Sequence, residues 1–126
     1  MYMDIIVTNN PLTEAMYRNA YRVECFETPG DVLTRVRDLV HGGRLLLTHP
    51  LPGGVKPNET PYRSVLVSET SGAVDEQSLR IIEECIRIVR DFPPATIPDR
   101  FLRDLQTVDL SLIQSALSAN RAPPGS

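Results

Sequence analysis

The amino-acid sequence predicts a single α/β domain in three layers, with a four-stranded, mainly parallel sheet followed by C-terminal helices. Short apolar runs alternate with helical repeats of apolar residues over the first 94 residues, which is the pattern of βαβ units. The length of 126 residues suits one hydrophobic core. We expect an α/β domain over residues 1–94, a helical extension over 95–121 and a disordered tail over 122–126.

Four short apolar segments are typical of buried strands, at residues 4–7, 22–26, 44–48 and 64–68. Helical patterns join the first strand to the second and the second to the third. The connection between the third and fourth strands is different, because its roughly 15 residues contain no helical pattern.

Three helices are predicted from capping residues at their starts, namely Asn10, Thr28 and Asp75. The first should cover residues 12–20, with Met16 facing inward. The second should end at the pair Gly42–Gly43 and bury Val32, Leu33, Val36, Leu39 and Val40. The third should end near Phe92 and bury Leu79, Ile82, Cys85, Ile86 and Val89.

The C-terminal region carries a helical apolar stripe formed by Phe101, Leu105, Val108 and Leu112, which is widened by Leu102, Ile113, Ala116 and Leu117. Because an amphipathic helix must cover its apolar face, this stripe packs either on the domain's own sheet or on a second chain in a homodimer. One helix or two are compatible with the sequence, since Asp109 or Ser111 could cap a second one.

Residues 48–62 form the most unusual segment of the chain. They include four of the eleven prolines, one of the two histidines and the only lysine, Lys56. Because prolines fix much of the backbone, and because long loops in compact domains tend to be functional, we expect an ordered functional loop.

Polar residues of this loop and of the strand ends are the candidate site residues. Ligands of open parallel sheets bind outside the carboxyl ends of the strands. The predicted ligand-binding residues are Asn9, Asn10, Thr48, His49, Lys56, Asn58 and Glu59. His49 and Glu59 are the candidates for proton transfer, and Lys56 for holding an anion.

Each of these candidates also has a structural interpretation. His49 could hold the loop through a backbone hydrogen bond, and Lys56 could be solvated or paired with Glu59. Asn9 and Asn10 could serve only to cap the first helix. Cys25, at a strand end, could be a reactive thiol or an inert one, whereas Cys85 belongs to the predicted core.

Composition narrows the function classes. A net charge of −3 and a pI near 5.3 indicate no general attraction to nucleic acid or to anionic membranes. No apolar run reaches the length of a membrane helix, and the N-terminus does not resemble a signal peptide. Neither the cysteines nor the histidines have metal-ligand spacing, so we predict a cytoplasmic protein without a metal or a cofactor.

Three segments of the sequence resemble the GrdX family: residues 8–11, 45–51 and 55–62. The resemblance covers about residues 3–92. GrdX-family proteins are small and are encoded beside glycine, sarcosine and betaine reductase components in anaerobic bacteria. The resemblance implies a role in amino-acid metabolism, without an activity that can be carried over.

The sequence is therefore compatible with two functions, and it does not decide whether the protein is an enzyme. In the first, the protein is an accessory protein that binds a component of a reductase complex through the loop. In the second, the loop residues His49, Lys56 and Glu59 form a site for a small anion, carboxylate or phosphate, with or without catalysis.

Overall fold

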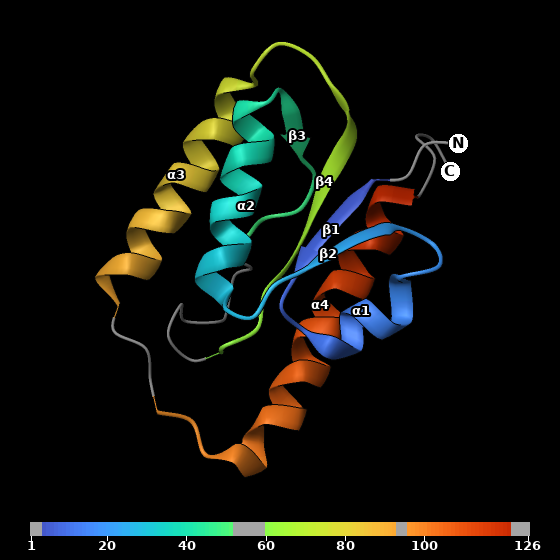
Figure 1. The fold of residues 1–126 in the computed structure, drawn as a ribbon, viewed down its shortest axis with the longest axis vertical. Coiled ribbons are helices and arrows are strands. Elements are labelled where there is room, and N and C mark those ends of the chain that lie inside the picture. Colours follow the sequence, from blue (N-terminus) through green and yellow to red (C-terminus); the bar gives the residue numbers. More distant parts are fainter. Residues whose placement is uncertain (1–3, 52–59, 93–95, 122–126) are drawn as a thin grey trace.

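The computed structural model describes residues 4–51, 60–92 and 96–121 (Figure 1). Within these ranges the chain forms four strands, four α-helices and one short 3-10 helix. Their order is β1 (Ile5–Thr8), α1 (Pro11–Tyr17), β2 (Arg22–Cys25), α2 (Pro29–His41), β3 (Arg44–Leu46), β4 (Ser64–Ser71), α3 (Glu76–Asp91), η1 (Asp99–Phe101) and α4 (Leu102–Arg121).

The four strands form one mixed sheet in the order β2-β1-β4-β3. Only β1 and β2 pair in parallel, whereas β4 is antiparallel to both β1 and β3. The prediction of a mainly parallel sheet was therefore wrong. Parallel neighbours need a long crossover, usually a helix, while a chain that returns by a loop can pair antiparallel. The connection from β3 to β4, which has no helical pattern, is a return of this second kind.

Alternate residues of the central strands enter two apolar clusters. Ile5, Val7 and Val67 belong to a cluster that contains the inner residues of α2 and Ile82 of α3. Ile6 and Leu66 point the other way, into a cluster with Ile113 and Leu117 of α4. Figure 1 shows α2 and α3 on one side of the strands and α1 and α4 on the other.

The three predicted capping residues are confirmed. Asn10 accepts a hydrogen bond from the backbone N–H of Leu12 at 3.0 Å, and Thr28 and Asp75 do the same at α2 and α3. The predicted inner residues of α2 are all buried. At the end of α2, Gly43 has a φ of 94°, the left-handed conformation that favours glycine.

The orientation of α1 differs from the prediction. Met16 is 52% exposed, so its inward placement was wrong. The inner face of α1 instead carries Thr13, which is fully buried, and Tyr17, one helical turn later. Tyr17 packs edge-to-face on Tyr21 at a centroid distance of 5.7 Å. A hydrogen bond between Thr13 and Ser64 of β4 holds this face of α1 toward the sheet.

The C-terminal region after η1 is a single helix, α4. Neither Asp109 nor Ser111 caps a second one, because both lie inside α4. Ile113 and Leu117 are buried against the sheet, while Phe101 and Val108 are 44% and 49% exposed. The helix therefore contacts the sheet through Ile113 and Leu117, which belong to the widened part of the predicted stripe, whereas Phe101 and Val108 stay exposed.

Candidate functional site

Asn9, directly after β1, joins this strand to the segment before β4. Its side chain donates to the carbonyl oxygen of Pro61 at 2.6 Å and accepts from the backbone N–H of Arg63 at 2.8 Å. Its backbone N–H donates to the carbonyl oxygen of Arg63. In all three contacts Asn9 binds backbone groups of Pro61 or Arg63. Asn9 therefore fixes the position at which the chain enters β4.

Asn10 belongs to a buried polar cluster that includes Asp109 of α4. The Asn10 amide donates to Asp109 Oδ2 and to the carbonyl oxygen of Gln106, both at 2.9 Å. Ser64 donates to the same Asp109 oxygen at 2.6 Å. The hydroxyls of Thr8 and Thr13 lie 2.7 Å and 3.1 Å from Ser64 Oγ. The cluster thus links β1, α1, β4 and α4.

Burial shifts the pKa of two charged groups in this region. Burial raises the pKa of Asp109, while hydrogen bonds from Ser64 and Asn10 and the charge of Arg63 oppose the rise. Arg63 is only 4% exposed, and burial lowers its pKa against the opposing negative charge of Asp109. The negative charge of Asp109 and the positive charge of Arg63 thus stabilise each other near the first residue of β4.

Thr48 and His49 follow β3 and form hydrogen bonds with different segments of the chain. Thr48 Oγ1 accepts from the backbone N–H of Leu66 at 2.9 Å, so Thr48 extends the pairing with β4. His49 is exposed, and its Nδ1 accepts from the backbone N–H of Leu51 at 3.0 Å. This is the backbone contact expected of a histidine that holds a loop. It also places the proton of the neutral ring on Nε2.

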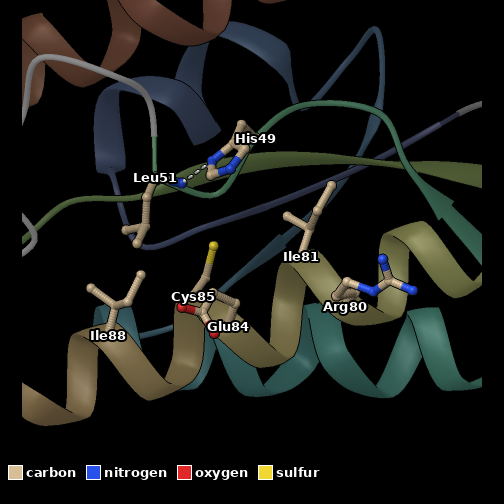
Figure 2. Close-up of a pocket in the computed structure, with 7 residues that line it drawn as sticks. All are labelled: His49, Leu51, Arg80, Ile81, Glu84, Cys85 and Ile88. Carbon is tan, nitrogen blue, oxygen red and sulfur yellow. Dashed lines mark hydrogen bonds between the residues drawn. The ribbon is translucent and has the colours of Figure 1, made fainter.

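An open pocket of about 340 Å³ lies between the residues after β3 and helix α3 (Figure 2). Leu51, Ile81, Ile88 and the Cys85 thiol supply its apolar lining. Its polar lining comes from His49, Arg80 and Glu84. Figure 2 shows the Cys85 sulfur pointing from α3 toward the His49–Leu51 segment, which forms the opposite wall. We call this site the α3 pocket.

Both cysteines carry protonated thiols at neutral pH. Burial raises the pKa of Cys85 to about 11, and the charge of Arg63 only partly opposes it. Partial burial of the sulfur, with the neighbouring Glu14 carboxylate, raises the pKa of Cys25 to about 11 as well, although the residue as a whole is exposed. Neither thiol is therefore activated as a nucleophile.

The predicted site residues have different surroundings in the structure. Asn9 and Asn10 bind the start of β4 and α4, whereas His49 lines the α3 pocket. Lys56, Asn58 and Glu59 lie outside the described residues. Their convergence with His49 on one concavity therefore stays a prediction.

Two functional features were missed in the sequence. Asp109 was interpreted as a helix cap, although a carboxylate surrounded by Leu105, Leu112 and Ile113 on a helical face is a signal of a buried polar contact. Arg80 on α3 was not considered, because its place in the lining of the α3 pocket depends on how α3 packs. No local sequence signal marks that place.

The described residues contain neither a candidate metal site nor a candidate membrane span. Over residues 4–51, 60–92 and 96–121, no group of three or more His, Cys, Asp or Glu side chains is placed to hold a metal ion. None of the helices in the same ranges has the length and apolar character needed to cross a bilayer.

The chain matches a known protein family over most of its length. A family model described as GrdX-like protein matches residues 5–118, which extend from β1 almost to the end of α4. The resemblance found in the sequence is thereby confirmed over a longer range. No curated protein and no solved structure matches the chain significantly.

Proposed function

Because the chain belongs to the GrdX-like protein family, we propose that it is a non-catalytic accessory protein of amino-acid reductase metabolism. In this role it acts in the cytoplasm and binds one component of a glycine, sarcosine or betaine reductase. The link to these reductases comes from the family, and the docking surface comes from the geometry of the α3 pocket.

The α3 pocket is the observation that carries this proposal. Its centre is formed by Leu51, Ile81 and Ile88, and charged side chains border it. An apolar centre with a polar rim is the usual composition of protein–protein interfaces. The pocket wall also contains the start of the unusual 48–62 segment. This partial overlap supports the proposal that the pocket is the docking surface.

The state of the two thiols supports a non-catalytic role. A cysteine nucleophile needs a lowered pKa, and the pKa of both thiols is raised to about 11. Cys85 is buried in the pocket wall, where its thiol packs as an apolar group rather than a reacting one.

Co-purification of the full chain with each purified reductase component tests this proposal. We expect the wild-type protein to bind one component and the variant Ile88→Asp to bind it at least about tenfold more weakly, because a charge then replaces an apolar contact. Val74→Asp is the matched control, since Val74 is 46% exposed and lies outside the pocket. Absence of binding to every component, or equal losses in both variants, would refute docking through this pocket.

The second candidate is binding of a small anion, and Arg80 favours it. Within the described part of the chain, Arg80 makes no hydrogen bond or ion pair, yet it lines the same pocket as His49. A guanidinium and an imidazole are groups that can hold an anion, and both belong to the lining of this pocket. In this second function Lys56 and Glu59 stay candidate contributors from the adjoining segment.

A homodimer through Phe101, Leu105, Val108 and Leu112 is part of the proposal. Phe101 and Val108 remain largely exposed after α4 has covered the sheet, so they are available to a second chain. Light scattering should then give the mass of a dimer for the wild type and of a monomer for Val108→Asp. A wild-type monomer at micromolar concentration would contradict the dimer.

A further inference from the structure

We propose that the homodimer forms by antiparallel pairing of α4 with α4 of a second copy of the chain. The contact is a single row of residues along α4, which we call the α4 seam. It consists of Phe101, Leu105, Val108, Leu112, Ser115 and Ala119. This inference rests on the homodimer proposed above. It adds the direction of the two helices and two contact residues, Ser115 and Ala119, that the apolar stripe does not contain.

The α4 seam lies on a flank of the helix that is turned away from both the sheet and α1. Ile113 and Leu117 bury the side of α4 that faces the sheet. On one flank, Gln114 donates to the sulfur of Met16 on α1 at 3.0 Å. The seam follows the opposite flank, where Val108 is 49% exposed. Figure 1 shows the first turns of α4, in orange, extending beyond the ends of the strands, so this part of the seam projects past the sheet.

The spacing of the seam is typical of a helix that pairs with another helix. Its residues follow one another at alternate steps of four and three positions, which is the average period of 3.5 residues of a coiled coil. The buried residues Asp109, Ile113 and Leu117 form a separate row with steps of four. Contact with the sheet therefore accounts for one row of α4, and the seam is a second row.

The charge of this helix face indicates a second copy as the partner. Between Leu105 and Ala119 the only charged residue is Asp109, which is buried. By contrast, α3 carries at least one charged residue in every turn from Glu76 to Asp91. Depletion of charged residues is typical of the core of a protein interface. Two uncharged seams can meet without repulsion, whereas a charged partner would find no opposite charge there.

The sizes of the seam side chains favour the antiparallel direction. A two-fold axis midway between Val108 and Leu112 produces three kinds of layer across the seam. They are Phe101 with Ala119, Leu105 with Ser115, and Val108 with Leu112. The largest side chain thus meets the smallest, and every layer is filled to a similar extent. Parallel helices would instead crowd two phenylalanines at one end and leave two alanines at the other, which is poor packing.

Disulfide cross-linking of the full chain in a Cys25→Ser background tests the direction. Under mild oxidation, a mixture of Leu105→Cys and Ser115→Cys chains should form a linked dimer, because these positions face each other. Either variant alone should stay unlinked, since its two cysteines lie about 15 Å apart along the axis and a disulfide needs Cα atoms within about 7 Å. In the control mixture Thr107→Cys replaces Leu105→Cys and should give no link, because Thr107 is exposed on another face of α4.

A charge at Ser115 tests whether the seam reaches the C-terminal half of α4. Ser115→Asp should weaken the dimer at least about tenfold in light scattering, because the charge then faces Leu105 of the second chain. Thr107→Asp is the matched control, since it places the same charge at an exposed position of α4 outside the seam and should leave the dimer intact. Equal effects of the two substitutions would overturn the seam.

The outcomes separate this inference from the functions proposed above. Cross-linking of each single variant with itself, or no link in the mixture, would refute the antiparallel seam and leave a homodimer of another geometry. A wild-type monomer that still binds a reductase component would refute the seam and keep the accessory role. A cross-linked dimer that binds no reductase component would keep the seam and refute that role.

Discussion

Asp109, in the interior of α4, accepts a hydrogen bond of 2.6 Å from Ser64, the first residue of β4. The same carboxylate oxygen accepts from Asn10, the cap of α1. Three elements that are far apart in the sequence thus meet at one carboxylate. Because burial makes a charged group costly unless it is hydrogen-bonded, this contact constrains how α4 lies on the sheet.

Replacement of Asp109 by alanine should destabilise the protein. The substitution leaves the Ser64 hydroxyl and the Asn10 amide without their shared acceptor, and we expect a loss of about 2 kcal/mol in the free energy of unfolding. Urea denaturation measures this change. The control Asp104→Ala removes an exposed carboxylate of the same helix and should cost less than about 1 kcal/mol. Equal losses would show that the buried contacts contribute nothing specific.

The raised pKa of Asp109 predicts the sign of a pH effect. An acid with a raised folded-state pKa contributes stability that is fully present below its ordinary pKa of 3.8 and is lost as pH rises through the folded-state pKa. The free energy of unfolding of the wild type, measured relative to Asp109→Asn, should therefore fall over this window. Urea titrations at several pH values give the difference. A difference that increases with pH would contradict the assignment.

The thiols should be slow to react with iodoacetamide. With its pKa raised to about 11, the exposed Cys25 is almost entirely protonated at pH 7.5, and its rate should rise about tenfold per pH unit up to pH 10. Cys85 should be modified only on unfolding, because it is 2% exposed. Mass spectrometry of Cys25→Ser and Cys85→Ser separates the two. A rate that levels off near pH 8.5 would disprove the raised pKa of Cys25.

Gly43 should be intolerant of a side chain. A Cβ atom there would lie 1.9 Å from the carbonyl oxygen of Gly72, and the φ of 94° is unfavourable for other residues. We expect Gly43→Ala to lower the free energy of unfolding by at least about 2 kcal/mol. Gly42→Ala is the control, since its nearest contact would be at 3.4 Å. Similar thermal denaturation of the two variants would refute this constraint.

The helix starts and the inner faces of α2 and α3 could be predicted from the sequence because they depend on neighbouring residues. A cap such as Thr28 binds a backbone N–H three positions away, and the apolar period of a helix is contained in the helix itself. One part of the candidate site could also be predicted from local sequence, because the segment that contains His49 is unusual in its own composition.

Tertiary structure alone decided the features that join distant segments. The direction of β4 depends on where the chain returns after β3, and the inner face of α1 depends on a partner, Ser64, in β4. The presence of His49 and Arg80 in the lining of one pocket, and the burial of Asp109, likewise require a helix to dock in one place. Local propensity is insensitive to such contacts, because their free energy comes from burial and hydrogen bonding between elements that only the folded chain brings together.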